Sequence, residues 1–89
     1  MEITYHEFVI KRDIPALDTE IKRRIRQTIE QKLSSNPLLY GVPLRATLHQ
    51  LWKLRVGDYR VIFRIKNKEV LVFVIAHRSV AYKIAEKRI

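Results

Sequence analysis

Cationic side chains recur between Leu51 and Ile65 in a pattern that could bind an anion. This stretch predicts two β-strands that reverse at Gly57-Asp58, because apolar residues occupy every second position on both sides. A glycine at the first turn position suits a tight two-residue hairpin. The positions between the apolar ones hold Lys53, Arg55, Arg60 and Arg64. The hairpin therefore predicts a basic face opposite an apolar one.

The turn also predicts which residues lie opposite each other. The expected pairs are Val56 with Tyr59, Arg55 with Arg60, Leu54 with Val61 and Trp52 with Phe63. Two arginines directly across a strand pair repel each other and mildly destabilise it. One interpretation is an ordinary solvated face that happens to be basic. We favour the other, in which a bound phosphate chain relieves the repulsion.

Composition and charge predict one folded domain, residues 1–89, with a directed basic surface. Residues 1–30 hold 6 Lys/Arg and 6 Asp/Glu, whereas residues 31–89 hold 12 and 3, so the whole net charge of +9 lies in the second part. Nucleic acid is the favoured partner class, an acidic protein segment the second and a membrane surface the last. The longest apolar run, Val70–Ala76, is too short to span a bilayer. The absence of cysteine fits a reducing cytoplasm.

The remaining chain supplies the elements that must position the basic face. A first strand is expected at Glu2–Phe8, and a helix from Thr19 to about Ser34. Val9–Leu17 is ambiguous, because its apolar spacing is helical but Pro15 would end or bend a helix. A connector follows at Leu38–Gln50. The pattern predicts an α+β fold with about four antiparallel strands, two N-terminal helices on one face and a short C-terminal helix.

The third strand of the predicted sheet core is Val70–Ala76, which is apolar on both faces as a central strand would be. Continuing the hairpin register pairs Ile65 with Val70 and Arg60 with Ile75. That register leaves His77 on the basic face, just past the end of the strand. A C-terminal helix is expected at Val80–Arg88.

Two segments resemble the RelE/ParE toxin superfamily. The run Trp52-Lys53-Leu54-Arg55-Val56-Gly57-Asp58-Tyr59-Arg60-Val61-Ile62 is similar to its signature strand pair. The run from Val74 to Tyr82, with His77-Arg78 and Tyr82, is similar to the closing strand and the His-Arg…Tyr segment of its RelE branch. The order of the elements also matches over nearly the whole chain.

The resemblance implies the toxin of a toxin–antitoxin pair, neutralised by an antitoxin protein that wraps around it. RelE-type members cut messenger RNA (mRNA) in the ribosomal A site, next to ribosomal RNA. ParE-type members share the fold but act on DNA gyrase and lack the ribonuclease residues. A non-catalytic RNA-binding module is the remaining alternative.

Carried over by position, Lys53, Arg55 and Arg60 match basic residues of the RelE cleavage site, Arg78 the arginine after the last strand, and Tyr82 the tyrosine near the C-terminus. RelE has a further lysine at the position of Leu51, so the identity of the general base is open here. Like charges nearby would favour a neutral Lys53 amine that acts as the base, and His77 is the competing candidate. Arg60 and Arg78, assisted by Arg55, would stabilise the charge on the phosphorane.

Tyr82 could donate a proton, stack on an unpaired base or simply pack against the core. Arg64 and Lys83 are expected to bind RNA outside the reacting group. The chemistry needs neither a cofactor nor a metal ion. Replacing Arg60 or Arg78 by alanine is expected to abolish toxicity and leave the fold intact, since neither lies on the predicted apolar face.

Overall fold

The predicted central helix is present in the structure, a computed structural model that describes all 89 residues. Helix α1 spans Thr19–Thr28 and continues as the wider turn η2, Ile29–Leu33. Asp18 caps its first turn, because its Oδ1 accepts a hydrogen bond from the N–H of Ile21 at 3.0 Å. Ile25, Ile29 and Leu33 are buried. The apolar stripe therefore faces the core, as the four-residue spacing predicts.

The sheet has five strands in the order β1-β5-β4-β3-β2. They are β1 Glu2–Tyr5, β2 Val42–Pro43, β3 Trp52–Val56, β4 Tyr59–Lys66 and β5 Glu69–His77. Strand β1 is parallel to β5, and the other neighbours are antiparallel. The α+β class is confirmed. The fifth strand is β2, a two-residue pairing inside the predicted connector, and β1 is shorter than the predicted first strand.

The hairpin register is confirmed at each of the four predicted pairs, including Arg55 with Arg60. Gly57 has a φ of 60°, a left-handed conformation that glycine adopts without strain. The register between β4 and β5 agrees at Ile65 and Val70 but then shifts between Ile62 and Phe63, because β5 carries one extra residue there. The predicted pair of Arg60 with Ile75 is therefore wrong, and Arg60 lies opposite Ala76.

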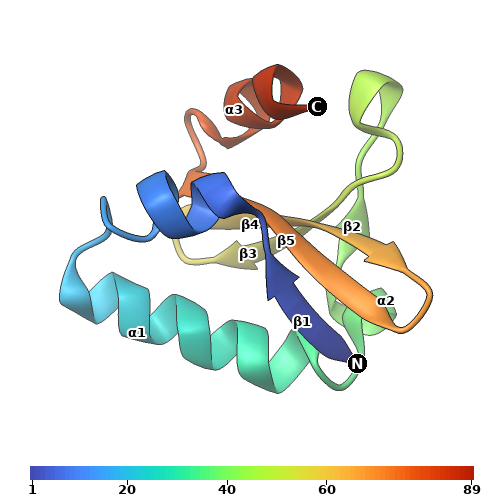
Figure 1. Cartoon of the computed structure of the whole chain (residues 1–89), viewed down its shortest axis with the longest axis horizontal. Helices are drawn as coiled ribbons and strands as arrows, with labels where there is room; N and C mark the ends of the chain where they lie inside the picture. Colours follow the sequence, from blue (N-terminus) through green and yellow to red (C-terminus); the bar gives the residue numbers. More distant parts are fainter.

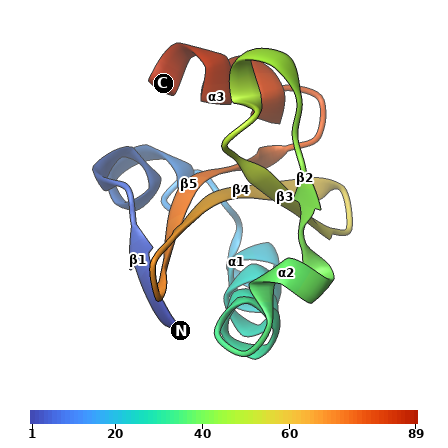
Figure 2. The same cartoon turned by 90° about the vertical axis from the view of Figure 1, so that its right-hand side faces the viewer.

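Helices cover both faces of the sheet, α1 on one side and α3 on the other (Figure 2). Helix α3 spans Ala81–Arg88, close to the predicted range. The face under α1 and η2 holds one buried cluster that includes Leu54, Val61 and Phe63. The opposite face, which carries the basic positions of β3 and β4, holds a second cluster that includes Ile62, Phe73, Val74, Ala76, Ala81 and Ala85. Only part of the basic face is therefore open to a ligand.

Two short elements complete the connector before β3. Helix α2 spans Pro37–Tyr40, and the single turn η3 spans Ala46–Leu48. The η3 turn lies on the same side of the sheet as α3 (Figure 2) and contributes Leu48 to the second cluster. The connector thus packs against the core as well as linking its neighbours.

An ion pair joins the two ends of the chain at the edge of β5. The ambiguous segment after β1 forms the helical turn η1, Val9–Asp13, which lies beside β1 in Figure 1. Both Asp13 oxygens accept hydrogen bonds at 2.8 Å from Arg88, and Asp13 Oδ2 also accepts one from the N–H of Ile75 at 2.9 Å. Arg88 donates a further hydrogen bond to the carbonyl oxygen of Phe73 at 2.9 Å. We call this pair the Asp13–Arg88 clasp.

None of the helices is long and apolar enough to cross a membrane.

Candidate active site

Strands β3 and β4 bring three of the predicted site residues together beside the Gly57 turn. Lys53 and Arg55 are two positions apart and share a face, and Arg60 lies directly opposite Arg55. Lys53 is half-buried and Arg55 is exposed. Side chains on opposed positions of an antiparallel pair are close enough to act on one ligand. The three basic side chains therefore lie on one face of the sheet.

The side chain of Arg60 is fixed to the turn. Its Nη1 donates hydrogen bonds to the carbonyl oxygens of Gly57, at 3.1 Å, and Tyr59, at 2.9 Å. Only 7% of Arg60 is exposed. The guanidinium is thus held in one place before any ligand arrives, which is the condition for preorganised electrostatic stabilisation.

Helix α3 places Tyr82 next to Lys53. The Lys53 Nζ lies 5.6 Å from the centroid of the Tyr82 ring, within the range of a cation–π contact. Ala81 and Ala85 are fully buried, so α3 packs closely on the sheet. Tyr82, which follows Ala81, is half-buried beside this helix–sheet contact. Two residues far apart in the sequence, one from β3 and one from α3, therefore meet at the site.

The segment after β5 brings Arg78 to the same turn. The backbone N–H of Arg78 donates a hydrogen bond to the carbonyl oxygen of Asp58 at 2.8 Å. The Arg78 side chain is exposed and has no hydrogen-bond partner within the protein. Its backbone position is therefore fixed, while its guanidinium is available to a ligand.

Few of the cations are neutralised by the protein's own carboxylates. The structure has three salt bridges, Lys11–Glu7, Arg23–Glu20 and Arg88–Asp13. None of them involves a predicted site residue, and Lys83 of α3 is likewise exposed and unpaired. The positive potential near the turn is therefore available to attract an anion.

His77 lies away from the basic face, contrary to the prediction. The shift in register places it opposite Tyr59, and the two rings meet edge to face with centroids 5.7 Å apart. Its Nδ1 accepts a hydrogen bond from the N–H of Ser79 at 3.2 Å, and the Ser79 hydroxyl oxygen is 2.8 Å from the same nitrogen. Tyr59 packs against the core under α1, so His77 is turned toward the face opposite Lys53.

Two contacts near the site carry no signal in the local sequence. Arg24 of α1 reaches the turn from the other face, since its Nη1 would lie 3.1 Å from a Cβ placed on Gly57. From the sequence, the Lys22–Arg26 cluster is expected to be a solvated helix face, with contact to ribosomal RNA as the alternative. The Asp13–Arg88 clasp joins residues 75 positions apart and holds the end of α3, the helix that carries Tyr82. Neither contact follows from a motif or a periodicity.

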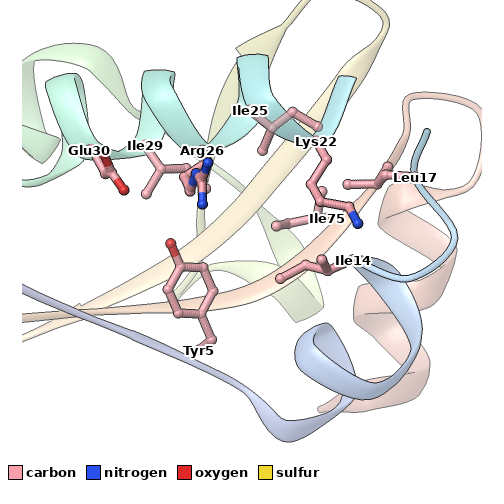
Figure 3. Close-up of a pocket in the computed structure, with 9 residues that line it drawn as sticks. All are labelled: Tyr5, Ile14, Leu17, Lys22, Ile25, Arg26, Ile29, Glu30 and Ile75. Carbon is pink, nitrogen blue, oxygen red and sulfur yellow. The ribbon is translucent and has the colours of Figure 1, made fainter. Parts of the chain in front are cut away.

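A largely apolar cavity lies on the other face of the sheet, between β1 and α1 (Figure 3). Its volume is about 350 Å³, and its walls include Ile14, Ile25 and Ile29. Figure 3 shows the Tyr5 hydroxyl pointing across it toward Arg26 on α1. The predicted site residues do not line this cavity, so it has no part in the site at the Gly57 turn.

The Tyr5 phenol should make the free energy of unfolding depend on pH in the alkaline range. Burial, with a smaller contribution from the negative charge of Glu30, raises the pKa of Tyr5 above its usual value, and Arg26 opposes this rise. Because the folded state holds this proton more tightly than the unfolded state, the free energy of unfolding should fall as pH rises through 10 and above. We expect Tyr5→Phe to lose less stability between pH 9 and 11 than the unsubstituted protein, as measured by urea unfolding. Equal losses in both proteins would contradict the assignment.

Comparison with known proteins identifies the family. Residues 6–82 match the family described as the ParE toxin of the type II toxin–antitoxin system parDE. Toxin RelE of Mycobacterium tuberculosis is 35% identical over 75 residues, covering 82% of this chain and 77% of the relative. Toxin RelG of the same organism is 31% identical over 75 residues, covering 82% and 86%.

The solved structures agree with these matches. The toxin–antitoxin complex RelBE2 of M. tuberculosis contains a chain that superposes with a TM-score of 0.80 at 28% identity, covering 86% of this chain and 96% of that one. The RelB–RelE complex of Methanococcus jannaschii gives 0.68 at 22% identity, covering 91% and 96%, and supports the fold alone. This protein therefore belongs to the RelE/ParE superfamily of toxins from type II toxin–antitoxin systems.

Proposed function

We propose that this toxin is a metal-independent endoribonuclease that cleaves mRNA on the ribosome. The observation that supports this proposal most is that Lys53, Arg55 and Arg60 share one face of β3 and β4, with Tyr82 beside Lys53 and the Arg78 backbone at the turn. No carboxylate is paired to any of these cations. A phosphodiester bound there would supply the missing negative charge. The sequence similarity to RelE and RelG toxins supports the same activity.

In the proposed reaction, Lys53 removes the proton from a ribose 2′-hydroxyl, whose oxygen then attacks the adjacent phosphorus. Arg60 and Arg78, with Arg55, stabilise the charge that develops on the phosphorane oxygens. The bond from phosphorus to the 5′-oxygen then breaks, and Tyr82 donates a proton to that leaving oxygen. The products are a 2′,3′-cyclic phosphate and a 5′-hydroxyl. The ribosome would hold the substrate in place, so that a small set of residues suffices.

The partners follow from the family and the charge. We propose that a cognate antitoxin neutralises the toxin, since the RelBE2 and M. jannaschii relatives were solved as toxin–antitoxin complexes. An acidic antitoxin segment would complement the basic part of the chain. In the cytoplasm, mRNA in the ribosomal A site and the surrounding ribosomal RNA would be the nucleic-acid partners.

The test is induced expression in a bacterium, followed by mapping of the 5′ ends of messages. New ends inside translated codons are expected within minutes of induction. A growth defect with intact messages would contradict the ribonuclease proposal, and the absence of any growth effect would favour a non-catalytic RNA-binding module.

Inhibition of DNA gyrase is the second candidate, because the matching family description names ParE. That activity requires a protein-binding surface and makes no use of a base, an acid and clustered guanidinium groups. It predicts induction of the SOS response with intact messages, so the same expression experiment separates the two candidates.

The two candidate bases are expected to differ strongly in their effect. We expect Lys53→Met to lower the rate of mRNA cleavage by about 10²–10⁴-fold, because general base catalysis contributes about that much. His77→Gln should change the rate less than about tenfold, because His77 faces Tyr59 on the other side of the sheet. The measurement is single-turnover cleavage on programmed ribosomes between pH 6 and 9. A larger loss for His77→Gln would assign the base to His77.

A further inference from the structure

Arg64 has an unusual environment for a surface arginine. It is half-buried on β4, and its Nε is the one buried side-chain nitrogen or oxygen in the protein that lacks a hydrogen-bond partner. No salt bridge involves it, and its guanidinium carbon lies 5.9 Å from the centroid of the Phe73 ring. Buried polar atoms are nearly always paired in native proteins, so this unpaired donor marks Arg64 as a residue whose environment needs an explanation.

A small cavity adjoins Arg64. Its volume is about 190 Å³, and it lies between η3 and the strands β4 and β5. Leu48, Leu51 and Phe73 form apolar walls, while Thr47, His49 and Gln50 add polar groups. Apolar walls combined with a few polar groups, which fix the orientation of a ligand, are typical of small-molecule sites.

The loop that forms one side of this cavity is held in a strained shape. Ala46 has a φ of 57°, which a residue with a side chain rarely adopts. Its carbonyl oxygen accepts the backbone N–H of His49 at 3.1 Å, and the His49 Nδ1 is also 3.1 Å from it. Strain of this kind persists where the surroundings enforce it and is concentrated at ligand sites.

The cavity lies on the same side of the sheet as the proposed active site. Arg64 is four residues from Arg60 on β4, about 13 Å along a strand, and both face the side that carries α3. Leu51 and Arg64 both line the cavity, and Leu51 directly precedes β3, so the cavity also adjoins the strand of Lys53. An RNA strand bound at the site could therefore extend one of its bases into the cavity.

We propose that this cavity binds one unpaired base of the substrate RNA, with guanine preferred, next to the bond that is cut. The inference rests on the proposed ribonuclease function and adds the source of its base preference. A guanidinium presents two parallel N–H donors, and guanine presents two adjacent acceptors, N7 and O6, on one edge. Adenine presents an acceptor beside a donor there, and would leave one N–H of Arg64 unpaired.

Binding can be tested without cleavage. In NMR titrations of the free toxin with the four nucleoside monophosphates, guanosine monophosphate should shift the amide signals of residues 46–51 and the Nε–H of Arg64. The other three nucleoside monophosphates should bind at least about tenfold more weakly than guanosine monophosphate. Arg64→Met and Arg64→Lys should both lose the preference, whereas Lys66→Met, which removes a charge from the same strand, should keep it. Equal binding of all four nucleotides, or shifts elsewhere only, would overturn the proposal.

Cleavage separates this proposal from the function on which it rests. Ribosomes are programmed with messages that differ only in one A-site base, and single-turnover rates are compared. The unsubstituted toxin should cut the message with guanine at least about tenfold faster than the other three messages. Both Arg64 variants should cut all four messages at the rate that the unsubstituted toxin shows for those three. If the Arg64 variants cut every message more slowly by the same factor, the proposed base pocket would be overturned. If the toxin cuts no message but still binds guanosine monophosphate selectively, the ribonuclease function fails and the pocket stands.

Discussion

Replacing Arg78 by alanine is expected to lower mRNA cleavage by about 10²–10³-fold, the usual effect of removing one donor to transition-state charge. The melting temperature should change little, because the Arg78 side chain is exposed and makes no hydrogen bond within the protein. The backbone hydrogen bond to the Asp58 carbonyl oxygen does not depend on the side chain. Single-turnover cleavage and thermal unfolding of the same preparation measure the two effects.

Arg23→Ala is the matched control for this variant. It also removes one exposed guanidinium, but from α1, where Arg23 pairs with Glu20. Its cleavage rate should remain within about twofold of the unsubstituted toxin, because surface charges away from a site have small effects. Full activity in Arg78→Ala would place the phosphate site elsewhere.

Arg60 does not allow such a clean separation of activity from stability. The sequence predicts that Arg60→Ala leaves the fold intact, but Arg60 is buried and donates two hydrogen bonds to carbonyl oxygens of the turn. Its removal would leave those oxygens without their partner, so the variant should lose stability as well as activity. Arg78 is therefore the sharper test of the site.

Replacing Arg88 by methionine is expected to destabilise the fold by about 3–5 kcal/mol, because it leaves the buried Asp13 carboxylate without its counter-charge. The Arg88 and Asp13 side chains are only 8% and 6% exposed. The Phe73 carbonyl oxygen would also lose a donor. Urea unfolding followed by circular dichroism measures the change in the free energy of unfolding.

Two further variants check the cause of this loss. Lys87→Met, at the neighbouring exposed position of α3, should change stability by less than about 0.5 kcal/mol. Combining Asp13→Leu with Arg88→Met should recover part of the loss, since no buried charge then remains unpaired. Recovery should be incomplete, because Asp13 also accepts the N–H of Ile75. If Arg88→Met lowers the free energy of unfolding by less than about 1 kcal/mol, the Asp13–Arg88 pair behaves as a solvent-exposed ion pair and not as a buried one.

The elements that follow from local patterns were predictable. Helix α1 follows from the four-residue apolar spacing, and the register of β3 and β4 follows from strict alternation around Gly57. The extra residue in β5 did not follow, because the run Val70–Ala76 is apolar at every position and carries no period to show a shift. That one residue moves His77 to the opposite face.

The covering of the second face was not predictable for a similar reason. The apolar run Val70–Ala76 indicates that both faces of β5 are buried, but it does not show that Ala81 and Ala85 of α3 cover the second face. The clasp joins one acidic and one basic residue at a distance that no local pattern reports. The site residues on β3 and β4 were placed together by alternation, whereas the contact of Tyr82 with Lys53 needed the packing of α3.

The clasp and the parallel pairing of β1 with β5 have a consequence for biosynthesis. Residues 2–5 pair with residues 69–72, and Asp13 pairs with Arg88. The N-terminal segments of the fold therefore find their partners only after its C-terminal segments have been synthesised. Such long-range contacts form late in folding. A nascent chain that still lacks α3 would have no tyrosine beside Lys53, so the proposed active site would still be incomplete.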